Sequence, residues 1–266
     1  MNVQPPHVKP RLRSVGFGFA IVLTITAVTG GGCSTAPGSL KLAPELRGVV
    51  PKPVSGQRNG NEVRGALAFG RWSATPTMHL DDERRSAHAD ILATSANEEV
   101  GFDAMHTAFE FDLRSNGAPP SATGAQCIVR GRSGTHTAYH GRTTDETSIT
   151  LPGYPRIDCA FTGAQAGRLT VRPAFATQRD SGSAQFGEQL WEIRSVNNLD
   201  AQRTNFPLAR FGYEFRAGGQ AVAAVETWGA GRVWMDPGLT PQEEEQLSVA
   251  MAALLYYGSL LELDDI

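Results

Sequence analysis

The chain has 266 residues, of which 41% are hydrophobic and 19% are charged, and it carries 29 Gly and 16 Pro. This composition excludes a disordered, collagen-like or coiled-coil protein, so a folded protein is expected. The 24 Lys and Arg are outnumbered by 27 Asp and Glu, which gives a net charge of −3. A general affinity for nucleic acid is not expected at this balance, and no nucleic-acid partner is predicted.

Residues 1–32 are predicted to be a secretory signal peptide. Lys9, Arg11 and Arg13 form a basic start without an acidic residue, and residues 15–28 hold only apolar residues, Gly and Thr. This apolar run is shorter than the roughly 20 residues that a transmembrane helix needs. Cleavage is therefore favoured over a permanent membrane anchor.

The segment that follows, TGGGCS at residues 29–34, resembles the lipobox of bacterial lipoproteins, in which small residues precede a Cys that becomes the lipidated N-terminus. The resemblance implies lipidation of Cys33 and a lipid anchor in a membrane. It also implies a place in the cell envelope, facing the periplasm or the outside. The alternatives are secretion without a lipid and an uncleaved signal anchor.

The chain has three cysteines, Cys33, Cys127 and Cys159. An odd cysteine in an oxidising compartment needs an explanation, and lipidation of Cys33 would leave the other two as a pair. They lie in two segments that are predicted to be strands, residues 125–132 and 156–163. A Cys127–Cys159 disulfide is therefore predicted, and the alternative is two buried free thiols.

The chain after residue 32 is acidic, with 21 basic and 27 acidic residues and a net charge of −6. Residues 33–64 are rich in Pro, Gly, Ser and Asn, which predicts a flexible tether behind the lipidated Cys. One domain is expected to fill residues 65–266.

That domain is predicted to be mainly β, a closed barrel or a sandwich of about eight to twelve strands, with one buried C-terminal helix. The alternation of apolar and polar residues is clearest over residues 108–114, where Phe109, Phe111 and Leu113 share one face. A β-meander is expected from three segments separated by glycine turns: residues 210–216, 220–228 and 232–236.

The helix is predicted from Pro241 to about Leu261. Thr240 and Glu243 have the spacing of a capping box, with Pro241 at the first helical position. Residues 247–261 have Ser and Tyr hydroxyls as their only polar side-chain groups, so this helix must be surrounded by protein or lipid. Its apolar part rises only about 22 Å against the roughly 30 Å of a bilayer core, which favours burial inside the β domain.

The stretch from Phe211 to Leu261 is similar to the end of the tubby C-terminal, LURP-one-related and phospholipid scramblase-like group. It holds a strand, a Gly turn, the segment Val222–Trp228, a short strand and an apolar helix. The resemblance implies a β-barrel wrapped around a central hydrophobic helix. Members bind phosphoinositides or other membrane lipids through basic surface residues, but no residue of this acidic domain can be matched to that role.

No nucleophile elbow, Walker A, dinucleotide-binding or EF-hand motif is found. The candidate metal ligands are His136 and His140, but in a strand four residues span about 13 Å, too far for one ion. A solvated hairpin is favoured there. A second group of residues could act as metal ligands or as an acid–base pair, but a charged surface patch is the favoured interpretation because the adjacent Arg84 and Arg85 neutralise the acidic cluster. The group consists of His79, Asp81, Asp82, Glu83, His88 and Asp90.

The four tryptophans could line a ligand pocket, although packing in the core or at its rim is favoured. They are Trp72, Trp191, Trp228 and Trp234.

The sequence therefore predicts a non-enzymatic bacterial envelope lipoprotein without a cofactor, with a structural role or a role in binding lipid or another envelope component. One alternative is a secreted or anchored hydrolase-type enzyme with a dispersed active site that uses His88, His136 or His140. The other is an interaction protein that contacts its partner through the C-terminal helix.

Overall fold

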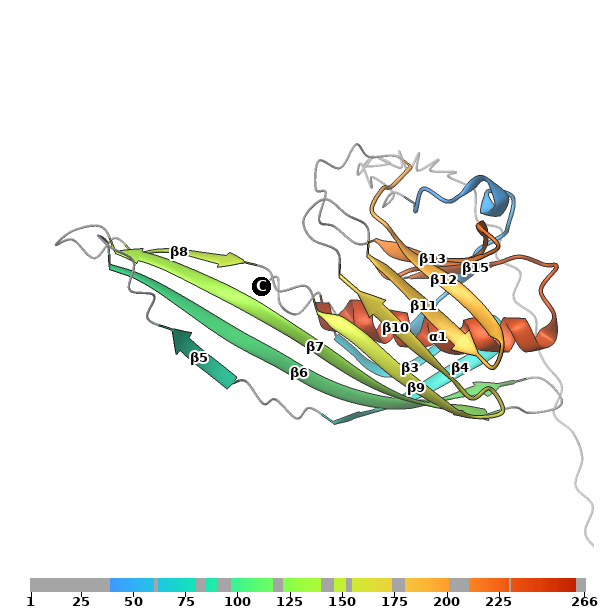
Figure 1. Ribbon diagram of the computed structural model, residues 1–266. Helices are drawn as coiled ribbons and strands as arrows, with labels where there is room; N and C mark the ends of the chain where they lie inside the picture. Colours follow the sequence, from blue (N-terminus) through green and yellow to red (C-terminus); the bar gives the residue numbers. More distant parts are fainter. Residues whose placement is uncertain are drawn as a thin grey trace, which may run out of the picture. The chain divides into compact units, whose positions relative to one another are not determined.

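The computed structural model describes ten stretches of the chain, and the fold is reported for these alone. They are residues 39–59, 62–79, 85–89, 97–116, 122–139, 146–151, 155–173, 180–200, 211–229 and 231–261. Within them, 15 strands form one sheet and a 21-residue helix, α1 (Pro241–Leu261), follows the last strand (Figure 1). A short 3-10 helix, η1 (Pro44–Leu46), precedes the first strand.

The strands are, in chain order, β1 (Lys52–Pro53), β2 (Ser55–Asn59), β3 (Glu62–Phe69), β4 (Trp72–His79), β5 (Arg85–Ala89), β6 (Asn97–Ser115), β7 (Ala122–Tyr139), β8 (Glu146–Leu151), β9 (Arg156–Gly163), β10 (Gly167–Arg172), β11 (Ser181–Phe186), β12 (Gln189–Val196), β13 (Gly212–Ala217), β14 (Gln220–Glu226) and β15 (Arg232–Met235).

The sheet is antiparallel and forms a nearly closed barrel. Its order is β1-β15-β14-β13-β12-β11-β10-β9-β7-β6-β4-β3-β2, with β5 paired to β6 and β8 paired to β7 outside this path. The two ends of the path, β1 and β2, are separated in the chain by Val54 alone, whose N–H donates to the carbonyl of Gly231 (3.1 Å). One short segment, residues 52–59, therefore contains both ends of the sheet and almost closes it.

The predicted fold class, mainly β with one buried C-terminal helix, is confirmed. The sheet has 15 strands, more than the eight to twelve expected. Part of the excess comes from β1 and β2, which lie within the segment expected to be a tether. The rest includes β5 and β8, which pair with the long strands β6 (19 residues) and β7 (18 residues) where these extend beyond the barrel (Figure 1).

The barrel encloses α1, which is predicted correctly in both position and burial. Every residue from Leu247 to Tyr257 is fully buried. Phe109, Phe111 and Leu113 of β6 face inward, as their alternation predicts. The capping box is also present, since Thr240 N–H donates to Glu243 (2.8 Å) and Glu243 N–H donates to Thr240 Oγ1 (3.3 Å).

The predicted meander forms β13, β14 and β15, joined in antiparallel register. Gly218 and Gly219 between β13 and β14 have φ of 55° and 85°, which is the backbone conformation that a tight two-residue hairpin turn requires. No helix among the described residues combines the length and the apolar character needed to cross a membrane.

Polar side chains fix the N-terminal end of α1 to the barrel. Glu244 is paired with Lys52 (3.1 Å) and Arg71 (2.8 Å). Thr123 of β7 donates to the buried carboxylate of Glu245 (3.0 Å). These contacts set the rotation and depth of the helix, which apolar packing alone would leave less defined.

Near the other end of α1, the hydroxyl of Tyr256 donates to the carbonyl of Ala74 (3.0 Å), and burial raises the pKa of this hydroxyl above its ordinary value of 10.0. Neutral Tyr256 therefore stabilises the fold fully below pH 10, and this contribution is lost as the pH rises above that value. Tyr256→Phe should cost about 1 kcal/mol at neutral pH, because the buried hydrogen bond to the Ala74 carbonyl is lost. Urea unfolding on either side of pH 10 should also show a weaker alkaline loss of stability in the variant; equal losses would contradict this.

The N-terminal part of the described chain covers the outside of the barrel, which corrects one prediction. Leu40 and Leu46 are fully buried in a second apolar cluster outside the barrel, with strand residues and residues next to the strands: Val196, Leu199, Phe211, Ala221, Ala224 and Trp234. Ala43 N–H donates to Glu214 of β13 (2.8 Å), whose carboxylate is thereby buried. A flexible tether reaching residue 64 is therefore wrong, because residues 39–59 belong to the domain, while residues 33–38 lie outside the described residues.

Candidate functional site

The predicted candidates for lipidation and metal binding lie mostly outside the described residues. These include Cys33, Asp81, Asp82, Glu83, Asp90 and His140. The backbones of His79, His88 and His136 lie in β4, β5 and β7. Among the described residues, no group of three or more His, Cys, Asp or Glu is placed to hold a metal ion.

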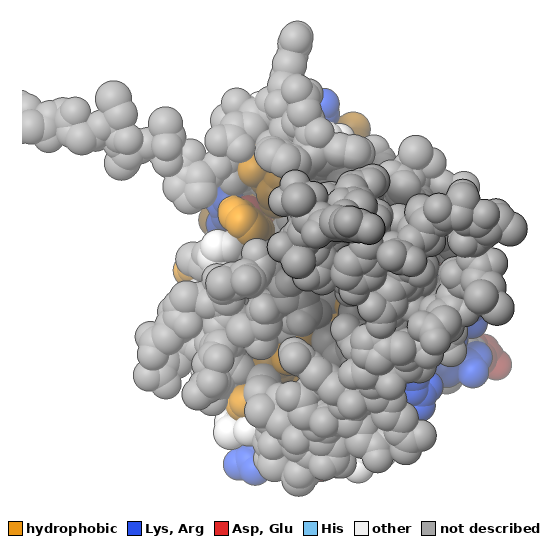
Figure 2. Space-filling view, turned by 90° about the vertical axis from the view of Figure 1, so that its left-hand side faces the viewer, with side chains coloured by type: hydrophobic (Ala, Val, Ile, Leu, Met, Phe, Trp, Pro, Cys, Tyr) orange, Lys and Arg blue, Asp and Glu red, His pale blue; other side chains and the backbone are white. Residues whose placement is uncertain are grey.

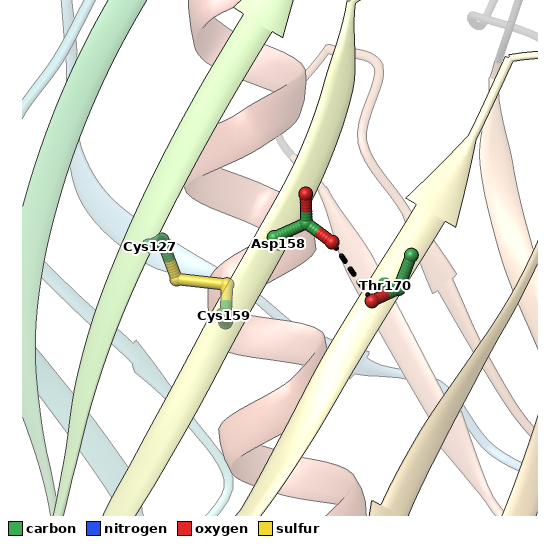
Figure 3. The surroundings of a disulfide bond; sticks show 4 residues. All are labelled: Cys127, Asp158, Cys159 and Thr170. Atoms are coloured by element: carbon green, nitrogen blue, oxygen red, sulfur yellow. Dashed lines mark hydrogen bonds between the residues drawn. A yellow bond between two sulfur atoms is a disulfide. The ribbon is translucent and has the colours of Figure 1, made fainter.

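The predicted disulfide is confirmed. Cys127 of β7 and Cys159 of β9 are register partners, and their sulfur atoms are bonded (Figure 3). Both side chains are almost fully buried and belong to the core around α1. The disulfide thus joins the two strands from the inner face of the sheet.

The tryptophans mostly belong to the core, as favoured. Trp72, Trp191 and Trp234 are at most 3% exposed. Trp228 is 48% exposed and packs edge-on against Phe211, with ring centroids 5.8 Å apart. None of the four lines the outer groove described next.

The outer face of β6, β7, β9, β10 and β11 carries an open groove made of two adjoining hollows. The first, of about 580 Å³, is lined by outward-facing residues that include Ala108, Ile128, Ala160 and Gln126. The second, of about 500 Å³, is lined by Arg156, Arg168, Thr170, Arg172, Ser181, Gly182 and Ser183. The two share Arg156, Arg168 and Thr170, so they form one surface, which we call the outer groove.

Four arginines lie on one line across the strands β7, β9, β10 and β12, and two of them, Arg156 and Arg172, line the outer groove. Arg130 of β7 is the register partner of Arg156 of β9. Arg172 of β10 follows the Val171–Ile157 pair and so lies beside Arg156. Ser181 of β11 continues the line, paired on one side with Arg172 and on the other with Arg194 of β12. We call Arg130, Arg156, Arg172 and Arg194 the arginine row.

Carboxylates form ion pairs with two of the four arginines of the row, Arg156 and Arg194. Asp158 accepts a bond from Arg156 Nη2 (2.6 Å) and from Thr170 Oγ1 (2.9 Å; Figure 3). Arg194 is paired with Glu192 (3.2 Å). Arg130 and Arg172 form no ion pair with any carboxylate of the described residues.

The groove also holds one further cation, Arg168, and one further carboxylate, Glu110. Arg168 is held by Gln185, with Nη2 to Oε1 at 2.7 Å. Glu110 lies at the far side of the groove, where its carboxylate accepts a bond from Gln126 (3.2 Å). In Figure 2, basic side chains with acidic neighbours gather at the lower right, on the side where β9 and β10 lie in front of α1 in Figure 1.

The arginine row carries a stability cost, because like charges directly opposite on neighbouring strands repel each other. Arg172→Gln should therefore raise the free energy of unfolding by about 0.2–1 kcal/mol at low ionic strength. The gain should vanish at about 1 M salt, where the Debye length is about 3 Å. Thermal unfolding at both salt concentrations measures this.

Arg114→Gln is the matched control for this substitution. Arg114 is 71% exposed on β6 and lies 3.8 Å from Asp112. Its loss removes the same charge from the outer surface without relieving a like-charge contact, so no gain is expected. A destabilised Arg172→Gln variant would show that the row is held together by contacts within the domain.

Sequence analysis missed the arginine row because its members are far apart in the chain. They become neighbours only through the register of four strand pairs, so no local motif marks them. The one local signal is that each arginine occupies an outward position near the end of its strand or, in β7, near the end of the part of the strand that belongs to the barrel.

In comparisons with known proteins, the chain matches no family model, no curated protein and no solved structure.

Proposed function

We propose that the chain is a non-enzymatic, lipid-anchored binding protein of the bacterial cell envelope, and that its outer groove binds an anionic ligand. The observation that carries this proposal is the arginine row on a hollowed face of the barrel. The lipid anchor is proposed from the sequence, where a signal peptide leads to Cys33.

The chemistry of the groove suits carboxylates and phosphates. Guanidinium groups offer planar pairs of N–H donors that match both anions, and such charge-assisted hydrogen bonds are stronger than neutral ones. Thr170, Ser181 and Ser183 place hydroxyl groups beside them. Since Asp158 holds Arg156 in one orientation, part of the site is ordered before a ligand arrives.

The barrel interior offers no comparable site among the described residues, because α1 fills it. The burial of α1 also argues against the alternative in which this helix contacts a partner, because the helix would first have to leave the barrel to expose its apolar surface. For the hydrolase alternative, the register places His88 opposite Gly101 and His136 opposite Val100. These partners are successive residues of β6, so the backbones of the two histidines lie at neighbouring register positions on either side of this strand, and their side chains lie outside the described part of the chain.

Binding can be tested with the full-length processed protein in detergent, titrated with polygalacturonate and with polyphosphate. We expect saturable, salt-sensitive binding of at least one polymer by the wild type. Arg172→Glu should weaken it at least tenfold, which corresponds to about 1.4 kcal/mol. Arg114→Glu makes the same charge change outside the groove and should leave the affinity within about twofold.

Two results would contradict binding at the groove: no binding of either polymer, or equal losses in the two variants. The anchor has its own test, the intact mass of the protein extracted from membranes. Loss of residues 1–32 together with added acyl mass on Cys33 is expected. An unmodified Cys33 would refute the lipid anchor but would leave the proposed binding at the outer groove unaffected.

A further inference from the structure

We infer that the ligand of the outer groove is an extended acidic glycan that lies across the strands, along the arginine row from β7 to β12. This inference rests on the proposed function and adds the class of ligand and its direction on the surface. It follows from how the basic groups repeat, from what separates them, and from the neutral groups beside them.

The arginine row is too long for a single anion. Neighbouring strands of a sheet lie about 4.8 Å apart, so the four steps from β7 through β9, β10 and β11 to β12 cover about 19 Å. One carboxylate or phosphate can contact two adjacent arginines, such as Arg156 and Arg172. Contact with both Arg130 and Arg194 requires anionic groups repeated along a chain.

The repeat runs across the strands and not along them. On one side of the row, the outward position two residues away on the same strand is never an arginine. It is Ile128 on β7, Asp158 on β9, Thr170 on β10 and Glu192 on β12. On this side, the line parallel to the arginine row is therefore neutral or acidic. A polyanion that followed a single strand would meet a neutral or acidic position next to each arginine of the row, and on β10 Thr170 separates Arg172 from the next arginine, Arg168. A polyanion that follows the row meets a guanidinium on four of five strands.

The groups between and beside the arginines favour a glycan over other linear polyanions. Ser181 stands within the row, and Thr170 and Ser183 lie next to it in the same hollow. These hydroxyls match a chain that alternates anionic groups with hydroxyl groups, as acidic sugars do. Ala108, Ile128 and Ala160 give the adjoining hollow an apolar floor that suits the C–H faces of sugar rings.

The test is the dependence of affinity on ligand length, measured with galacturonate oligomers of increasing length on the processed, detergent-solubilised protein. For the wild type, affinity should rise with length until the oligomer spans about 19 Å, four strand spacings, and then level off. The variants Arg130→Gln and Arg194→Gln change the two ends of the row, Arg172→Gln changes its centre, and Arg114→Gln is the control outside it. Near-ultraviolet circular dichroism checks that each variant is folded.

With the dimer, we expect Arg172→Gln to weaken binding and at least one end variant to have no effect. With oligomers that span the row, each of the three row variants should weaken binding about tenfold, since one charge-assisted contact is lost. Arg114→Gln should bind every length as the wild type does. The effect of the end variants should therefore emerge only as the ligand grows.

The outcomes separate this inference from the proposed function. If affinity does not rise beyond the dimer and the end variants bind all lengths normally while Arg172→Gln does not, the extended ligand is refuted and anion binding at the groove stands. If polyphosphate or single-stranded DNA of matched length binds more tightly than the galacturonate oligomers, the glycan assignment is overturned. If no row variant changes the binding of any polymer, both proposals fail.

Discussion

Replacing Leu254 by Ala is expected to lower the free energy of unfolding by about 2–5 kcal/mol. Leu254 is fully buried near the middle of α1. Strands surround the helix, and they are joined to one another by ladder hydrogen bonds, so the wall cannot easily collapse into the space that the lost atoms leave. The measurement is equilibrium unfolding in guanidinium chloride.

Leu190→Ala removes the same atoms from a surface position and serves as the control. Leu190 is 53% exposed on β12, so its loss should change stability by no more than about 0.5 kcal/mol. Similar costs for the two substitutions would show that α1 is loosely held in the barrel.

A cost of several kcal/mol at Leu254 is a large part of the 5–15 kcal/mol by which domains are stable. Deletion of residues 241–266 should therefore abolish folding altogether. A deletion variant that keeps native near-ultraviolet circular dichroism would mean that the barrel stands without the helix. In that case the interaction role of α1 would again become the better explanation of its apolar surface.

The parts of the fold that the sequence predicts well are those with local causes. The capping box at Thr240 and Glu243 marks where α1 begins, and the unbroken apolar run after it requires burial whatever surrounds it. The meander is equally local, because Gly218 and Gly219 define the turn between strands with clear alternation. In these places propensity, pattern and tertiary packing agree.

The segment of residues 39–59 could not be placed in this way. Its Pro, Gly and Ser content is typical of a tether, and its few apolar residues show no period. Leu40 nonetheless pairs with Leu199, and Ala43 contacts Glu214, both more than 150 residues away. Contacts of this range leave no trace in local composition, and they also explain why Glu214 is buried on a face that alternation would assign to solvent.

The outer groove was missed for a related reason. The sequence predicts the disulfide between β7 and β9, and this single pairing already aligns Arg130 with Arg156, since Cys127 and Cys159 fix the register three positions away. The remaining partners, Arg172 and Arg194, depend on the pairing of β10, β11 and β12. Only a full strand order turns four scattered arginines into one surface.

Reduction of the Cys127–Cys159 disulfide is expected to lower the free energy of unfolding by roughly 3–4 kcal/mol on the chain-entropy model. The bond joins residues 32 apart in sequence, and the enclosed segment holds β8 and the part of β7 that extends beyond the barrel. An unfolded chain with this loop closed has fewer conformations, so the bond raises the free energy of the unfolded state. Guanidinium unfolding with and without a reductant measures the effect.

The double variant Cys127→Ala, Cys159→Ala is the control: it should have the lowered stability and should not respond to the reductant. Because ladder hydrogen bonds on both sides of the disulfide also hold the register of β7 and β9, the folded variant should retain its affinity for polygalacturonate within about twofold, less than about 0.5 kcal/mol. A large loss of affinity in the folded variant would show that the disulfide itself aligns Arg130 with Arg156. The bond would then act on the binding surface as well as on stability.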